Sequence, residues 1–195
     1  MKHLLLASQS PRRKQLLEQA ELTFSIRTAH ADEDFPNDLD AEKVPLFIAV
    51  NKAQAVFQSL TKAEQENHII IAADTVVVLD GKIIGKPRDE ADAIAILRAL
   101  SGRVHKVVTG VVLQTSTGIQ ELKEITEVHF LPVSDEQIQH YISKYQPYDK
   151  AGAYAIQEWI GVTGIKFIEG DFYNVMGLPV SRVVQSLRNF KDYSG

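Results

Sequence analysis

The sequence predicts a mixed α/β (α+β) fold in which a twisted, mixed β-sheet is flanked by helices. An apolar, β-branched run at residues 69–79 leads into an Asp-Gly turn, and further long strand-like segments cover residues 104–113 and 119–130. Helical periodicity recurs between these strands. Such a mixture favours one sheet packed between helices. We expect a single domain over residues 1–195, with two lobes around a cleft.

Length and composition limit the classes of protein to which this chain can belong. Its 195 residues are 45% hydrophobic, which is enough for one sizeable core. Lys and Arg number 21 against 25 Asp and Glu, so no basic surface for nucleic acid is expected. The absence of cysteine excludes disulfide scaffolds, thiolate metal sites and cysteine-based phosphatase chemistry. The apolar start is too short for a signal peptide or a membrane span, so we expect a cytoplasmic protein without membrane contact. A homodimer is an assembly that the sequence leaves open.

Local signals predict the elements of the N-terminal half. Residues 4–7 form a short apolar run typical of a buried strand. Ser10 is then expected to be a helix N-cap, with Pro11 as the first helical residue. Apolar residues recur at helical spacing over residues 44–60. The polar stretch 61–67 is expected to be a loop.

Similar signals continue through the C-terminal half. Acidic residues in a first turn and a Ser-x-x-Gln capping box both mark helix starts. The elements predicted here are a helix over residues 89–100, a helix from Ser134 to about Tyr145, a strand over residues 165–168 and a last helix over residues 178–190.

Two arginines in the first turn of a helix are the most unusual local feature. Arg12 and Arg13 lie where the helix dipole disfavours cations by up to about 1 kcal/mol. A bound polyanion would offset this cost, because free N–H groups, the hydroxyls of Ser8 and Ser10 and two guanidinium groups would converge on phosphate oxygens. The alternative is that both arginines are solvated or paired with carboxylates such as Glu18. The cluster as a whole favours anion binding.

Asp74 interrupts the apolar run and is the best candidate for a general base. A carboxylate in such a run is costly to bury unless it has a partner, so a structural carboxylate paired with a lysine is the alternative. A two-residue Asp-Gly turn pairs Leu79 with Lys82 and, counting outward, Thr75 with Lys86. Lys86 is thereby expected beside Asp74. Regular alternation puts Asp74 on the opposite face, so a bulge or a strand end is needed to bring them together.

Several other local features indicate no specific chemistry on their own. Residues 81–87 are not a P-loop, because the glycine spacing is short and a proline replaces the Ser or Thr that would meet magnesium. The histidines are scattered, and His105 and His129 are expected to be strand residues rather than metal ligands. Lys52 lies at the margin of a helical apolar stripe and can extend to solvent.

The ordered blocks along the chain resemble the signature blocks of the Maf (septum formation) family. The resemblance covers nearly the whole chain, and the joint order of the blocks is more specific than any block alone. The blocks are Leu6 to Arg13, Asn51-Lys52-Ala53, Ala73 to Val77, Gly85-Lys86-Pro87, Thr109-Gly110, Tyr148 to Gln157 and Asn174 to Pro179.

This resemblance implies a fold similar to that of inosine triphosphate pyrophosphatases, with a nucleotide in the cleft and a divalent cation, Mg or Mn, as cofactor. It implies that Asp74 activates water and that Glu33 and Asp74 help to hold the metal. It also implies a set of phosphate-binding residues, namely Ser8, Arg12, Arg13, Lys52 and Lys86.

The specificity positions of the family's dTTP and UTP branch carry Arg, Thr and Gln, which match Arg12, Thr75 and Gln157. We therefore expect hydrolysis of dTTP and UTP to monophosphate and pyrophosphate, with a housecleaning or cell-division role. The segments 158–160 and 170–173 depart from the branch's usual pattern near the expected rim of the base site. The rival functions are a non-catalytic nucleotide-binding protein of cell division and a pyrophosphatase for 7-methyl-GTP.

Overall fold

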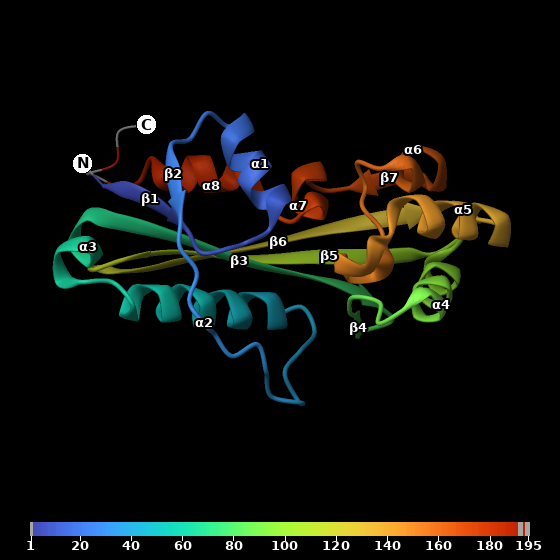
Figure 1. The fold of residues 1–195 in the computed structure, drawn as a ribbon, viewed down its shortest axis with the longest axis horizontal. Coiled ribbons are helices and arrows are strands. Elements are labelled where there is room, and N and C mark those ends of the chain that lie inside the picture. The colour runs from blue at the N-terminus through green and yellow to red at the C-terminus, as the bar shows by residue number, and fades with distance from the viewer. Residues whose placement is uncertain (1, 191–192, 194–195) are drawn as a thin grey trace. The chain divides into compact units, whose positions relative to one another are not determined.

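The computed structural model describes residues 2–190 and 193, and it contains a seven-stranded mixed sheet with helices against it (Figure 1). The strands are β1 (His3–Leu6), β2 (Phe24–Ile26), β3 (His68–Leu79), β4 (Lys82–Ile84), β5 (Val104–Thr115), β6 (Gly118–Phe130) and β7 (Ile165–Glu169). Their order is β2-β1-β3-β5-β6-β7, and β4 pairs with β3. β1 is parallel to β2 and β3, whereas the β3–β4 and β6–β7 pairs are antiparallel. The predicted fold class is confirmed.

The described helices are α1 (Pro11–Gln19), α2 (Val44–Gln58), α3 (Lys62–Asn67), α4 (Glu90–Leu100), α5 (Asp135–Tyr145), α6 (Trp159–Gly164), α7 (Phe172–Met176) and α8 (Val180–Leu187), with 3-10 turns η1 (Pro147–Asp149) and η2 (Ala151–Ala153). Side-chain caps start four of the described helices, α1, α3, α4 and α5. Ser10 caps α1, and Ser134 with Gln137 forms a capping box on α5, as predicted. None of the helices in the described ranges is long and apolar enough to cross a bilayer.

The chain divides into two compact units. The first comprises the described residues up to Asp74, Thr109–Glu124 and the described residues from Gly177 onward. The second comprises Thr75–Val108 and Ile125–Met176. The cleft expected from the sequence stays a prediction.

In the first unit, helices cover the strands on both sides. Figure 1 shows α2 on one side of the strands and α1 and α8 on the other. Helix α2 packs its small residues Ala49 and Ala53, both fully buried, against Ile70 of β3 and Val112 of β5. Gly110 lets the start of α2 approach β5 closely, since a Cβ there would lie 2.3 Å from the Cα of Leu46.

The second unit is built around α4, α5 and the ends of the long strands. Helices α4 and α5 pack together, and α4 also packs on η2. An aromatic cluster of His105, Phe130 and Tyr154 fills part of its interior, with ring centroids 5.1–5.4 Å apart. Gly152 lies against Val77, where a Cβ would be 2.9 Å from a side-chain methyl group.

Two expectations were wrong. The stretch 61–67 is not a loop, because Thr61 and Glu64 form a reciprocal capping box that starts α3. The pairing of Thr75 with Lys86 does not form either, because the β3–β4 register runs only from Leu79–Lys82 to Val77–Ile84. The chain leaves β4 at that point, and the carbonyl of Gly85 accepts a hydrogen bond from the Gly152 amide at 3.1 Å. Strand β2 and helices α6 and α7, all short, were not predicted from the sequence.

Candidate active site

A strand-to-helix turn in the first unit holds the serines and arginines singled out by the sequence. The Oγ of Ser10 accepts from the Arg13 amide at 3.5 Å, and the Oγ of Ser8 accepts from the Ser10 amide at 3.2 Å. The first turn of α1 contains no acidic residue. The turn therefore combines the positive end of a helix with two side-chain cations, which is an arrangement suited to an anion.

The two arginines have different surroundings. Arg13 is buried, and its guanidinium donates from Nε to the carbonyl of Gly177 at 2.9 Å and from Nη1 to the Oγ of Ser8 at 3.2 Å. Burial lowers the pKa of Arg13, and the carboxylate of Asp74 opposes that shift. Arg12 is half-buried. Arg13 thus fixes the turn against the segment before α8 and adds a buried positive charge.

A charged triad forms the centre of the first unit's candidate site. The ammonium of Lys52 on α2 lies 2.8 Å from Asp74 on β3 and 2.7 Å from Glu33 in the preceding loop. The side chains of Lys52 and Asp74 are only 20% and 17% exposed, whereas Glu33 is 64% exposed. The carboxylate that interrupts the apolar run therefore has the partner that its burial requires.

The neighbours of Lys52 support the same site. Asn51 donates from Nδ2 to the carbonyl of Asp32 at 3.2 Å, which ties the loop that carries Glu33 to α2. Ala53 is fully buried in the core cluster. The Asn-Lys-Ala block thus holds a loop, carries a cation and packs the helix with three successive residues.

The remaining predicted site residues belong to the second unit. Thr75 is half-buried and continues β3 beyond Asp74. Lys86 and Gln157 are exposed, so a polyanion or a base edge has access to both side chains. Lys86 follows β4, and Gln157 lies between η2 and α6.

A buried polar network on both sides of Gln157 was missed by the sequence reasoning. Lys150, 8% exposed, contacts Asp149 at 2.8 Å and Glu158 at 3.6 Å. The hydroxyl of Tyr141 donates to Glu158 and accepts from the Ala155 amide at 3.1 Å. Burial, and then the hydrogen bond to Glu158, raises the pKa of Tyr141 above its usual value. The only sequence signal for this network was Lys150, a lysine among small residues. Its less exposed ion-pair partner is Glu158, which departs from the branch pattern.

Comparison with known proteins identifies the family. Residues 3–190 match the family model of Maf-like proteins. The chain belongs to the Maf family.

Several relatives of this Maf chain carry one functional name, dTTP/UTP pyrophosphatase. The protein of that name from Cytophaga hutchinsonii is 47% identical over 184 residues, covering 94% of this chain and 82% of the relative. That from Porphyromonas gingivalis is 48% identical over 188 residues, covering 96% and 94%. That from Phocaeicola vulgatus is 46% identical over 186 residues, covering 95% and 94%.

Two other residues of the Maf signature blocks, Asn174 and Gly110, hold strands and helices together. Asn174 is fully buried and donates from Nδ2 to the carbonyl of Val107 and to the Oγ1 of Thr126, both at 3.0 Å. Gly110 permits the close approach of α2 to β5. Asn174 thus joins strands β5 and β6 to α7, and Gly110 lets α2 pack on β5.

Proposed function

We propose that this Maf protein hydrolyses dTTP and UTP to the nucleoside monophosphate and pyrophosphate. The observation that carries the proposal is the charged triad of Lys52, Glu33 and Asp74 in the same unit as the arginine-bearing start of α1. The names of relatives that are 46–48% identical over nearly the whole chain supply the substrates.

In the proposed reaction, Asp74 accepts a proton from a water molecule as the water oxygen attacks the α-phosphorus. The bond from the α-phosphorus to the bridging oxygen breaks, and pyrophosphate leaves with the electron pair. Lys52 holds the Asp74 carboxylate in place, because its ammonium donates a hydrogen bond to Oδ1 at 2.8 Å. Proton acceptance by a positioned carboxylate contributes typically about 10²–10⁴-fold to the rate.

The proposed phosphate site consists of Ser8, Arg12, Arg13, Lys52 and Lys86, which act by contact or by charge. Arg12 at the start of α1 is the direct guanidinium ligand in this proposal. Arg13 contributes its charge and holds the turn, because its Nε and Nη1 already bond Gly177 and Ser8. Fixed cations and helix N–H groups stabilise charge that builds on phosphate oxygens in the transition state.

The carboxylates of Glu33 and Asp74 also fit a divalent cation, Mg or Mn. Both contact one ammonium, that of Lys52, so they flank a position that already suits a positive charge. Oxygen ligands are those that Mg²⁺ and Mn²⁺ prefer. When bound, such a cation would neutralise charge on the triphosphate.

Arg12, Thr75 and Gln157 are the proposed specificity residues. The amide of Gln157 can donate and accept, which matches the carbonyl and N–H edge shared by uracil and thymine. The buried contacts of Lys150, Tyr141 and Glu158 would keep the Gln157 segment in place. Cytosine presents a different edge and leaves polar groups unpaired in a site built for uracil. We propose that the enzyme acts in the cytoplasm, removing unwanted nucleotides or restraining cell division.

The test is a nucleotide panel with Mg²⁺ or Mn²⁺, in which pyrophosphate and orthophosphate are measured separately. We expect pyrophosphate, with kcat/KM highest for UTP and dTTP and lower for CTP, GTP and 7-methyl-GTP. Gln157→Ala should flatten this preference, whereas Gln139→Ala, an exposed glutamine on α5, should leave it unchanged. Orthophosphate as the product would refute the site of attack. Binding without turnover would favour the non-catalytic alternative, and a preference for 7-methyl-GTP would favour the other pyrophosphatase.

A further inference from the structure

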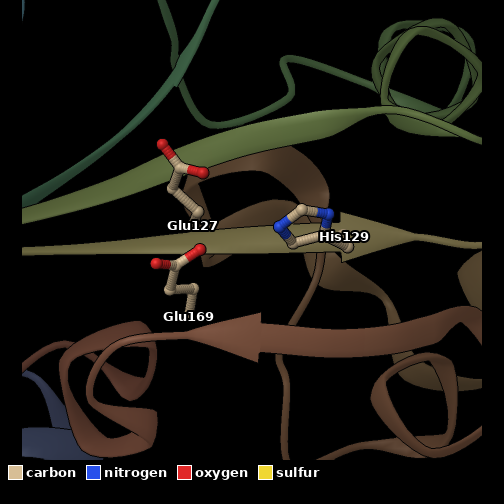
Figure 2. Close-up of side chains that lie close together, drawn as sticks. All are labelled: Glu127, His129 and Glu169. Atoms are coloured by element: carbon tan, nitrogen blue, oxygen red, sulfur yellow. The ribbon is translucent and has the colours of Figure 1, made fainter.

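A second group of metal-ligating side chains lies in the second unit, on β6 and β7. Glu127, His129 and Glu169 each present one ligand atom, and these atoms all lie within 4.8 Å of one another. Figure 2 shows Glu127 and His129 on β6 and Glu169 on β7. None of the three belongs to the predicted catalytic set.

The register of the two strands explains why these side chains meet. Glu127 pairs directly with Glu169, and His129 pairs with Phe167. Because residues two apart on a strand share a face, Glu127 and His129 point the same way, and Glu169 faces Glu127 across the pair. The register shifts between His129 and Phe130, where a bulge or irregularity adjusts the aim of the strand.

The cluster contains two carboxylates that face each other across the strand pair. Two carboxylates directly opposite on paired strands repel each other. In the described part of the chain, no lysine or arginine forms an ion pair with Glu127 or Glu169. A cation between the two strands would remove this repulsion.

The imidazole of His129 supplies an independent indication. Its Nε2 atom is buried and has no hydrogen-bond partner, although a buried polar atom normally has one. The ring stacks on Phe167, with centroids 3.9 Å apart and planes at 21°, so its orientation is fixed by packing. An oriented nitrogen without a partner beside two carboxylates is the arrangement that a metal ion completes.

We propose that Glu127, His129 and Glu169 bind a divalent transition-metal ion, with Zn²⁺ as the best match, which clamps strand β7 to β6. An imidazole with two carboxylates suits zinc better than magnesium or calcium, which prefer oxygen ligands alone. Zinc bonds of about 2.0–2.2 Å would bring neighbouring ligand atoms to roughly 3.3 Å, so the side chains need to close by about 1.5 Å at most. Water completes the coordination. The ion is structural, because β7 is an edge strand of only five residues, whose pairing it would reinforce.

The test measures zinc uptake by metal-free, full-length protein in an Asp74→Asn background, which weakens the proposed catalytic metal site. Equilibrium dialysis should show one more bound Zn²⁺ per chain than in Glu127→Gln, His129→Gln or Glu169→Gln. Glu121→Gln removes an exposed carboxylate from the same strand and is the matched control, so its zinc uptake should equal that of the background protein. If the three cluster variants bound as much Zn²⁺ as the Asp74→Asn background protein, the proposal would be overturned.

Thermal unfolding gives a second readout, because Glu127→Gln should change Tm in opposite directions with and without zinc. At free Zn²⁺ about 100-fold above its dissociation constant, the background protein should gain roughly 5–10 °C in Tm, and Glu127→Gln should gain none. Without metal, Glu127→Gln should have the higher Tm, because it removes one of two facing charges. A zinc shift that survives Glu127→Gln, or the absence of any shift in the background protein, would contradict the proposal. The result is independent of nucleotide hydrolysis.

Discussion

Replacing Gly110 by alanine tests how closely helix α2, which carries Lys52, packs on the sheet. The added Cβ would lie 2.3 Å from both the Cα and the amide nitrogen of Leu46, and 2.6 Å from the carbonyl carbon of Pro45. These are backbone atoms, so no side-chain rotation relieves the clash. To restore ordinary contact the start of α2 must move by about 1 Å. Overpacking of this kind costs typically about 1–3 kcal/mol, and a backbone clash belongs at the upper end.

Such a movement of α2 has a measurable effect on stability and on activity. In a chain of this size, roughly 2–4 °C of Tm corresponds to 1 kcal/mol, so Gly110→Ala should lower Tm by about 6–12 °C. Lys52 is on the same helix and contacts Asp74 at 2.8 Å, so its ion pair should lengthen. A misplacement of about 1 Å can cost as much as 10²-fold in rate.

The assay compares thermal unfolding and pyrophosphate release in Gly110→Ala and in Gly118→Ala. The control adds the same methyl group at a position with nothing within 4 Å. It should retain the Tm and turnover of the unaltered protein. If Gly110→Ala matched the control in both measurements, the close approach of α2 to β5 would not be a constraint.

Three further changes test individual groups. Asp74→Asn should lower turnover by about 10²–10⁴-fold while nucleotide still binds, with the exposed Asp38→Asn as control; near-normal activity would remove Asp74 as the base. Arg12→Ala should weaken binding of the triphosphate or its transition state by about 1.5–3 kcal/mol. Arg188→Ala, at an exposed position, is the control and should leave binding unchanged. If KM and kcat were unchanged in Arg12→Ala, Arg12 would not be a phosphate ligand. Burial, and then the charge of His129, lowers the pKa of His105 from 6.5 to about 4. Between pH 4 and pH 6.5, His105 is therefore protonated in the unfolded chain and neutral in the folded chain. The free energy of unfolding should therefore fall by up to about 3 kcal/mol as pH drops from 6.5 to 4, and urea titrations should show a smaller fall in His105→Gln.

The parts of the fold that the sequence predicted correctly are those fixed by neighbouring residues. The cap of α1 is a contact between Ser10 and a residue three positions along. The β3–β4 turn forms where Asp80 and Gly81 both adopt positive φ, at 52° and 74°, as a two-residue hairpin of this type requires. In both cases the information and the structure lie within the same few residues.

The errors have equally specific causes. The stretch 61–67 contains the same kind of capping box that was recognised at Ser134, but its polar composition was given more weight than the Thr61–Glu64 spacing. The continued pairing of Lys86 was extrapolated from the turn, whereas the Gly85 carbonyl bonds Gly152, far along the chain. A hydrogen bond to a distant segment has no local signal in the sequence.

In the candidate site, too, contacts between neighbouring residues could be predicted from the sequence, whereas contacts between distant segments could not. The closeness of Ser8 and Arg13 follows from one strand-to-helix turn, so the sequence could indicate it. The contact of Lys52 with Glu33 and Asp74 joins a loop, a helix and a strand. Without the family resemblance, the position of Lys52 beside an apolar stripe indicated only a solvent-reaching lysine. Tertiary packing, rather than any local pattern, makes it the centre of the triad.

The different surroundings of the two neighbouring arginines lead to a last prediction. Successive residues on a helix point about 100° apart, so Arg12 and Arg13 cannot both face one ligand in the same way. Arg13 is buried and bonds Gly177 and Ser8, whereas Arg12 is half-buried at the same helix start. Lysine retains the positive charge but loses the planar fork of donors.

Arg13→Lys should therefore lower Tm by several degrees, because about 1.5–3 kcal/mol is typical for a lost hydrogen bond to a charged group. Arg12→Lys should lower Tm less than Arg13→Lys, because Arg12 is only half-buried, and it should raise KM or lower kcat for UTP. Measuring Tm and steady-state kinetics for both variants separates a residue that fixes the turn from one that binds phosphate. If Arg12→Lys lowered Tm as much as Arg13→Lys, or if Arg13→Lys changed only KM, the assignment of the two arginines to different roles would be wrong.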